Sequence, residues 1–439
     1  MSSKSDSQSD SADSQSEDSP AESPKQRFGW IGAFGYHDYR MLWIGNLAST
    51  GTMTLRNLTA LQWLYEETGS AALLGALGLT QLVQMPLVIY GGALADNADR
   101  KRLMSLTQLI PFLMLVGLTI SAATDRLEPW HIFLVTMASG MALTLGQPAR
   151  TAMVSRVVPR RALPQAVAAN SATMQIASVA VPLIFILLFK IWGPTGAFGT
   201  AAVLGGLTVF LPYLIRVSGA PAAGAKKVSI QSLVEGWKYV RTHRILPGLY
   251  LMDIGVTVMS FYRELFPIFA DQLYGYGAGG VGLLRSSNSI GGIAGSMVVL
   301  KTNSWKRKGL LVLGATMVYA VLLIAFGFNT NFFIGLAIVA LLGATDAIGM
   351  VMRQMIVQLT TPDAMLGRAT SAHSFSAMGA NHLGQAEVGA MSGAIGAGNT
   401  MVLGGVVSIA VVILVWKYIP GVRKYEYTDQ DPNAPPDTS

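Results

Sequence analysis

Long apolar blocks separated by short polar connections make up most of this chain. Twelve blocks of about 20 or more mostly apolar residues, the length that spans a bilayer as a helix, follow one another between positions 41 and 418. Within a block the apolar residues neither alternate, as in a half-buried strand, nor keep to one helical face. We therefore expect lipid to surround them. The predicted membrane-spanning helices lie near 41–64, 72–95, 103–123, 130–153, 165–189, 196–215, 245–270, 279–300, 309–327, 331–357, 369–393 and 399–418.

The connections between these helices are mostly very short, so neighbouring helices are expected to be antiparallel. The stretch 216–244 is longer and is the predicted boundary between two halves. It begins with the flexible segment 219–224 and continues as an amphipathic helix with Ile230, Leu233 and Trp237 on one face. The pattern predicts an all-α polytopic membrane protein with twelve transmembrane helices in two six-helix halves.

Basic residues gather on one side of this predicted helix array. The membrane-proximal tails and the connections on that side hold 23 Lys and Arg, whereas the other side holds Arg126 and Lys190. Cytoplasmic loops carry such an excess of Lys and Arg. The sequence therefore predicts a multi-pass protein of the cell (cytoplasmic or inner) membrane with both termini in the cytoplasm.

The two ends of the chain lack apolar blocks. Residues 1–27 are rich in Ser, Asp, Glu, Gln and Pro, which is typical of a disordered acidic tail and not of a signal peptide. The expected organisation is a disordered acidic cytoplasmic tail at 1–27, an N-terminal six-helix half at 28–215, a cytoplasmic linker at 216–244, a C-terminal six-helix half at 245–418 and a cytoplasmic tail at 419–439.

Composition excludes several other functions. Only 13% of residues are charged, against about 25% in soluble proteins. The net charge of +7 comes from clusters between apolar blocks, so it reflects topology and not nucleic-acid binding. Cysteine is absent, which removes disulfides, thiolate metal sites and cysteine nucleophiles. The chain also lacks a phosphate-binding loop, so we expect neither an enzyme nor an ATP-driven pump, and no cofactor or metal.

An internal repeat supports the two-half organisation. Sliding the chain against itself by 203 positions brings six pairs of identical residues into register, among them two arginines and two prolines that are rare inside apolar blocks. Duplicated halves are common in secondary transporters that open alternately to each side. The pairs are Gly92 with Gly295, Arg150 with Arg353, Pro159 with Pro362, Leu163 with Leu366, Ala169 with Ala372 and Ser171 with Ser374.

The connection between the second and third predicted helices carries a family signature. It matches Gly-x-x-x-Asp-Arg-x-Gly-Arg-Arg/Lys at four positions, and it departs from that pattern at Asn97 and Asp99. The loop thereby resembles the major facilitator superfamily, in which this cluster latches the cytoplasmic side shut in the outward-open state. The resemblance implies a conformational latch at Gly92, Asp96, Arg100 and Lys101.

Further segments resemble the branch of that superfamily that contains enterobactin exporters and related drug efflux proteins. Antiporters of the superfamily often carry Gly-Pro-x-x-Gly-Gly in the fifth helix, and here only Pro182 remains of it. The resemblance covers residues from 39 to about 425, nearly everything outside the tails. The segments that carry it are 39–46, 158–171, 235–241 and 384–389.

Ionisable residues inside the predicted helices are the candidates for transport chemistry. Each costs about 3 kcal/mol in the bilayer, so each needs a partner or a task. Asp253 and Asp346 lie nearest the middle of their helices, and burial in general favours the protonated form of a carboxyl group. They are the first candidates for proton coupling, with Glu264 and Glu387 behind them. The alternative is that each forms an interhelical ion pair that only fixes packing.

Other polar residues are expected to face a substrate cavity. The resemblance implies that the first, fourth, seventh and tenth helices line it. Arg56 and Arg263 are placed to meet an anionic part of a solute, or one of the buried glutamates. Arg150 and Arg353 lie about two turns from the cytoplasmic end, where snorkelling to water is the expected role. The substrate-cavity candidates are Arg56, Arg263, Asn46 and His382.

The leading hypothesis is a secondary active transporter, a proton-coupled exporter of a small amphipathic molecule such as a drug or a siderophore-like compound. The second hypothesis is a facilitator or importer of a small metabolite. From a different class, the chain would be a membrane subunit of a larger pump or a channel. The expected partners are a small-molecule substrate, protons and membrane lipids, but no nucleic acid, and the protein is expected to be a monomer.

Overall fold

Every element of the described chain is a helix. The computed structural model describes residues 32–87, 90–91, 94, 97–220, 230–302 and 305–426. Two of the expected latch residues, Gly92 and Asp96, lie outside the described residues. By length and composition alone, six helical stretches of the described chain are long and apolar enough to cross a bilayer. The other long helices, among them α1 and α10, carry more Gly and polar residues, and some of these polar residues line the cavities described below.

Apart from the second span, the helices of the first part follow the predicted spans closely. A single helical run covers the fifth and sixth of these spans and is broken at Gly193, whose φ of 60° and ψ of −157° suit a residue without a side chain. The elements are η1 (Gly32–Gly35), α1 (His37–Thr68), α2 (Ala71–Leu82), α4 (Arg100–Ala123), α5 (Pro129–Val157), η2 (Arg160–Ala162), α6 (Leu163–Phe210) and η3 (Leu211–Leu214).

The second part repeats this order after the predicted amphipathic segment. That segment forms a short helix between the two parts. The elements are α7 (Ile230–Thr242), α8 (Leu246–Met259), η4 (Tyr262–Leu265), α9 (Phe266–Ile268), η5 (Phe269–Leu273), α10 (Gly277–Lys301), α11 (Lys308–Phe328), α12 (Phe332–Thr360), α13 (Asp363–Ile395), α14 (Ala397–Tyr418) and α15 (Pro420–Arg423).

Two predicted helices are interrupted. The span expected at 72–95 gives α2, which ends at Leu82 and is followed by a turn at 83–86. The span expected at 245–270 stops at Met259 and continues beyond Ser260 and Phe261 as shorter turns. Pro86 lies four residues after Leu82, and proline removes a backbone hydrogen bond and clashes with the carbonyl four residues before it, so α2 ends there. Pro267 lies eight residues after Met259, at the start of α9, and does not account for the second interruption.

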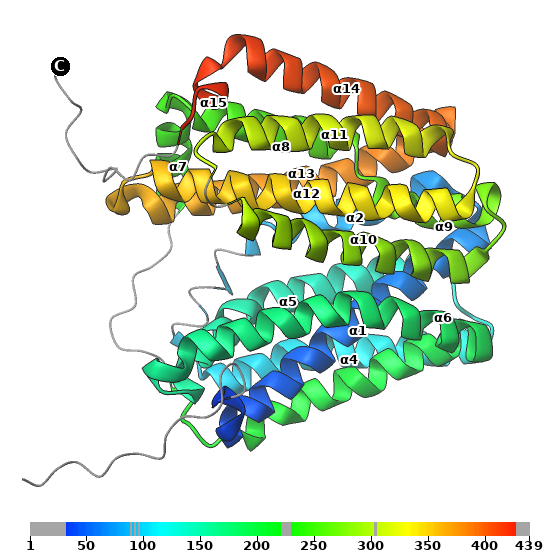
Figure 1. The fold of residues 1–439 in the computed structure, drawn as a ribbon. Coiled ribbons are helices and arrows are strands. Elements are labelled where there is room, and N and C mark those ends of the chain that lie inside the picture. The colour runs from blue at the N-terminus through cyan, green and yellow to red at the C-terminus, as the bar shows by residue number, and fades with distance from the viewer. Residues whose placement is uncertain are drawn as a thin grey trace, which may run out of the picture.

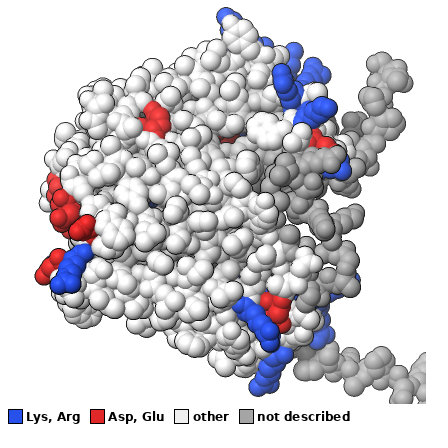
Figure 2. All heavy atoms as spheres, turned by 180° about the vertical axis from the view of Figure 1, so that it is seen from behind, with Lys and Arg blue, Asp and Glu red and all other residues white. Residues whose placement is uncertain are grey.

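Most of the charged side chains seen in Figure 2 lie at the two ends of the helix array, and the surface between them is almost free of charge. The first described residues and α15 lie at the same end (Figure 1), which we call the basic face. The connections at this end carry Arg100–Arg102, Arg156, Arg160, Arg161, Arg241, Arg244, Lys301 and Lys306–Lys308. We call the end that carries Arg126, Lys190 and Asp271 the opposite face.

The two parts pack together toward the opposite face and separate toward the basic face. One apolar core joins residues of both parts, from Leu64 and Phe185 to Phe266 and Phe326. Nearer the basic face each part has a core of its own, one around Tyr39 and Met153 and the other around residues 246–252 and 352–357. The interior between the parts is therefore closed at the opposite face.

Close contacts between glycines seal that end. A Cβ added to Gly75 of α2 would lie 2.7 Å from the Cα atom of Gly389 in α13. A Cβ added to Gly282 of α10 would lie 2.6 Å from the carbonyl oxygen of Pro182 in α6. Beside this second contact, the Ser286 hydroxyl donates to the Val179 carbonyl at 2.9 Å. Small residues let the helix backbones approach this closely.

Candidate functional site

Three cavities lie within the helix array. The C-half cavity, about 130 Å³, lies among α8, η4, α11, α12 and α13. The central cavity, about 410 Å³, lies between the two parts of the chain. The N-half cavity, about 600 Å³, is lined by α1, α5 and α6. Phe261, Arg263 and Asn381 line both the C-half and the central cavity, so these two are neighbours.

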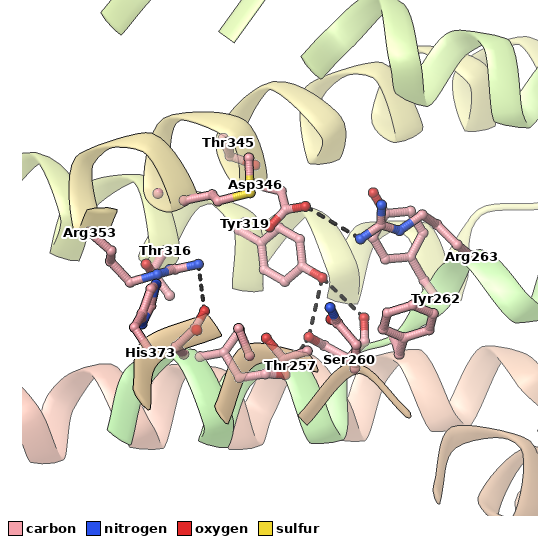
Figure 3. Close-up of a pocket in the computed structure, with 17 residues that line it drawn as sticks. Thr257, Ser260, Tyr262, Arg263, Thr316, Tyr319, Thr345, Asp346, Arg353 and His373 are labelled. Carbon is pink, nitrogen blue, oxygen red and sulfur yellow. Dashed lines mark hydrogen bonds and ion pairs between the residues drawn. The ribbon is translucent and has the colours of Figure 1, made fainter. Parts of the chain in front are cut away.

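A tight ion pair lies in the C-half cavity. The Arg353 guanidinium of α12 lies 2.8 Å from a carboxylate oxygen of Asp253 in α8, and the two side chains are only 9% and 10% exposed. His373 of α13 lies beside the pair and lines the same cavity (Figure 3). Such a pair is costly to break by removing one partner, because an unpaired charge then remains in a medium of low dielectric constant.

A second, looser pair occupies the other end of the same cavity. The Arg263 guanidinium of η4 lies 3.5 Å from an Asp346 carboxylate oxygen on α12, and both side chains are about one third exposed. Between the pairs, the Tyr319 hydroxyl donates to the Ser260 carbonyl at 3.0 Å (Figure 3). Both ion pairs therefore join the broken segment α8–η4 to α12.

A third pair extends the charged region into the central cavity. Glu264 follows Arg263 on η4, and a carboxylate oxygen of Glu264 lies 3.6 Å from the Arg285 guanidinium of α10. The interruption of the helix at Ser260 and Phe261 lets neighbouring residues face different cavities. Opposite charges from three helical segments thus meet where the two parts of the chain adjoin.

The N-half cavity has a different character. Its polar lining consists mainly of amides and hydroxyls, among them those of Asn46, Gln147 and Asn170. The Asn46 amide donates to the Asn170 side-chain oxygen at 3.2 Å across the gap between α1 and α6. Among the described residues that line this cavity, Arg150 is the one charged side chain. Apolar side chains, including Met53, complete the wall.

The structure brings some of the expected site residues together and leaves others apart. Asp253, Asp346 and Arg263 share the C-half cavity. Glu264, Arg263 and His382 share the central cavity, and Asn46 lines the N-half cavity.

Two expected site residues lie away from these three linings. Arg56 is 5% exposed and donates to its neighbour Asn57 at 2.9 Å. Glu387 of α13 has a buried Oε2 atom with no hydrogen-bond partner in the described structure.

The described part of the expected latch holds the end of the first half. The Arg100 amide donates to the Gly219 carbonyl at 2.8 Å, and the Lys101 ammonium donates to the Ile215 carbonyl at 2.9 Å. Asp99, which departs from the family pattern, caps α4 by accepting from the amides of Lys101 and Arg102. The loop thus fastens the start of the connecting segment to α4.

Several polar residues of these cavities were not singled out from the sequence. His373, Tyr319 and Ser260 are scattered over three helices, so no spacing along the chain joins them. Arg285 was not predicted as the partner of Glu264. The sequence feature that could have pointed to these cavities is the polar content of α10 and α13, which is high for membrane-spanning helices.

Several solved transporters share this fold. A POT family transporter in complex with 5-aminolevulinic acid superposes with a TM-score of 0.69 at 12% identity, over 89% of this chain and 97% of that chain. A bacterial homologue of the human lysosomal transporter Spinster gives 0.67 at 14% identity, over 90% and 99%. A D-xylose–proton symporter gives 0.61 at 14% identity, over 90% and 99%. The fold is that of a major facilitator transporter, an all-helical membrane protein that crosses the bilayer many times.

Sequence comparison is more specific. The model of the transmembrane secretion effector family matches residues 31–438, so the chain belongs to that family. It is therefore a transporter of a small molecule and not an enzyme. The enterobactin exporter EntS of Escherichia coli O1:K1 / APEC is 28% identical over 281 residues, which cover 64% of this chain and 67% of that protein. EntS of Shigella boydii serotype 18 is similar to the same extent.

Proposed function

We propose that this protein is a proton-coupled exporter that moves a small amphipathic molecule, a drug or a siderophore-like compound, by alternating access. Export is supported by membership of a secretion effector family and by 28% identity to an enterobactin exporter. The resemblance seen in the sequence pointed to the same branch.

The observation that carries the proposal is the pair of carboxylates in the C-half cavity. Asp253 and Asp346 each pair with an arginine, at 2.8 Å and 3.5 Å. Protonating either carboxylate cancels its attraction for the guanidinium and releases a contact between the α8–η4 segment and α12. Proton binding at these two sites therefore biases the arrangement of the two helices, which is what coupling to a proton gradient requires. Glu264 and Glu387 are the second-rank sites.

The closed opposite face supports a state that is ready to accept solute from the cytoplasm. We place the basic face, and both termini with it, in the cytoplasm of the cell membrane, because Lys and Arg are concentrated there. The separate cores near the basic face then belong to an inward-facing state. Outward opening requires the glycine contacts at the opposite face to part.

We propose that the cluster at the start of α4 is the latch in the exchange between the inward-facing and the outward-open state. Arg100 and Lys101 already hold the segment from Ile215 to Gly219. Their partners in the family signature are Gly92 and Asp96. In the outward-open state this cluster is expected to close the basic face.

Everted membrane vesicles test the proposal, because their lumen corresponds to the outside of the cell. Vesicles that contain the wild-type protein are expected to accumulate enterobactin or the dye Hoechst 33342 when respiration acidifies the lumen, and to lose it when a protonophore is added. Asp253→Asn and Asp346→Asn are expected to abolish this accumulation while the protein remains in the membrane.

Asp125→Asn is the matched control. Asp125 is exposed on a connection at the opposite face with a φ of 51°, a conformation that Asn also tolerates. This variant is expected to accumulate both probes like the wild type. Wild-type uptake that ignores the protonophore would instead identify a facilitator, and accumulation of neither probe would contradict export of this class of molecule.

A further inference from the structure

The internal repeat relates two clusters that differ in charge. Adding 203 to the numbers of Thr50, Arg150 and Asn170 gives Asp253, Arg353 and His373. The second set forms the tight ion pair and its histidine neighbour in the C-half cavity. The first set lines the N-half cavity. At this offset the counterpart of Arg353 is again an arginine, whereas the counterpart of His373 is an amide.

A tyrosine contact that recurs in both halves supports this correspondence for the fifth helices. In the first half the Tyr39 hydroxyl donates to the Ala166 carbonyl at 2.8 Å. In the second half the Tyr250 hydroxyl donates to the Ala369 carbonyl at 3.0 Å. The two acceptors are 203 positions apart, but the two donors are 211 positions apart. Both contacts join the first helix of a half to its fifth, so the first helices are not related by the offset that relates the fifth helices.

Among the described residues, Arg150 has no carboxylate to neutralise it. Its counterpart Arg353 is paired at 2.8 Å, whereas Arg150 takes part in none of the ion pairs formed by the described residues. Its neighbours in the cavity wall are neutral hydrogen-bonding groups. An arginine held inside the membrane region without an acidic partner marks a place where a solute supplies the counter-charge.

We propose that the N-half cavity binds the anionic group of an amphipathic organic acid, with the Arg150 guanidinium as its counter-ion. The planar guanidinium suits a carboxylate or sulfonate, which it can bind through two parallel hydrogen bonds. Asn46 and Asn170 lie within the same cavity to donate further bonds, and Met53, Leu143 and Val167 offer an apolar wall for the rest of the molecule. The proposal rests on the proposed transport function and narrows its substrate class.

The division of labour between the halves follows from this difference. Asp253 neutralises its arginine and exchanges protons, so the C-terminal half responds to the proton gradient. The N-terminal half keeps its arginine free for the solute. A carboxylate at position 50 would add a negative charge to the cavity lining that contains Arg150 and would oppose binding of an anion there.

Binding of two matched probes tests the assignment without relying on transport. We would measure binding of 2-naphthoate and of its neutral amide, 2-naphthamide, to the purified protein by equilibrium dialysis at pH 7.5. One charge-assisted hydrogen bond is worth roughly tenfold in affinity or more, so the wild type is expected to bind the acid about tenfold more tightly than the amide. Arg150→Gln and Thr50→Asp are each expected to remove this preference while binding of the amide stays unchanged.

Arg161→Gln is the matched control. It removes an exposed cation from the basic face of the same half, outside the cavity lining, and is expected to keep the preference. A wild type without preference for the acid, including one that binds neither probe, would overturn the proposal. Persistence of the preference in Arg150→Gln or in Thr50→Asp would also overturn it. Asp253→Asn is expected to keep the preference, so failure of proton coupling and failure of anion binding are measured separately.

Discussion

At the scale of single residues, Asp38 shows how one carboxylate closes the first half at the basic face. It lies in the first turn of α1, before the span predicted at 41–64, and accepts the amides of Arg216 and Val217 at 3.0 Å and 2.8 Å. Burial raises the pKa of Asp38, but these two hydrogen bonds and the neighbouring His37 lower it by more, so the pKa lies below its usual 3.8. The ionised form therefore stabilises the fold.

The sign of the pH dependence follows. A lowered pKa in the folded state gives stability that is present above the unfolded pKa and is lost as the pH falls through the lower folded value. Asp38→Asn is expected to cost about 2 kcal/mol at pH 7, seen as a lower thermal unfolding midpoint in detergent. The difference from the wild type should persist to pH 5 and narrow only below about pH 4. A difference that already narrows between pH 7 and pH 5 would contradict the assignment.

The ion pair between Asp253 and Arg353 offers a test that separates packing from coupling. Removing one member of a buried pair costs about 3 kcal/mol, whereas replacing both is close to neutral. Asp253→Asn and Arg353→Gln are each expected to lower thermal stability, and the double variant to recover most of it. The double variant should still show no proton-dependent transport. If it transports like the wild type, the pair serves packing alone.

At the scale of elements, the contact between α2 and α13 holds the opposite face shut. A leucine at position 75 has no room, because the Gly389 backbone lies against Gly75. Gly75→Leu is expected to shift the protein toward opening at that face. Since the chain contains no cysteine, a single Ser178→Cys reporter in the central cavity can be labelled with a membrane-impermeant maleimide from the opposite face.

The reporter should react faster in the Gly75→Leu background than in the wild type. Gly117→Leu is the matched control, because nothing lies within 4 Å of a Cβ added to Gly117 of α4. Equal labelling in all three proteins would show that the glycine contact does not govern access from this face.

The helices were largely predictable from the sequence, because a chain that crosses the bilayer needs long apolar segments. The interruptions of the helices were not predictable. Pro86 is visible in the sequence, but proline is tolerated inside many membrane helices. Pro111 and Pro148 lie within unbroken α4 and α5. Whether a proline ends a helix depends on packing around it, and the sequence does not contain that information locally.

The site was predictable in its residue types and not in its pairings. Asp253, Asp346 and Arg263 stood out as charges in an apolar setting. Their partners depended on how α8, η4 and α12 lie in space, which the break at Ser260 determines. Arg150 was expected to snorkel toward water, and its place in the wall of the N-half cavity emerged only when α1, α5 and α6 were seen together.

At the scale of the whole molecule, the two halves share a helix order but differ in charge. The C-half cavity contains two carboxylate–arginine pairs, and the N-half cavity contains one arginine among neutral groups. The two parts meet at the opposite face, where an apolar core and close glycine contacts join them. A solute bound in the first half and protons bound in the second half would therefore both bias the same movement, the rocking of one half against the other.

Proton movement by the purified protein tests this account most directly. Liposomes that contain the protein and enclose the pH dye pyranine would receive the solute that everted vesicles accumulate. The account predicts that solute entry changes the lumen pH with the wild-type protein, and that a variant carrying both Asp253→Asn and Asp346→Asn produces no change. Solute entry through the wild-type protein without any change in lumen pH would contradict it.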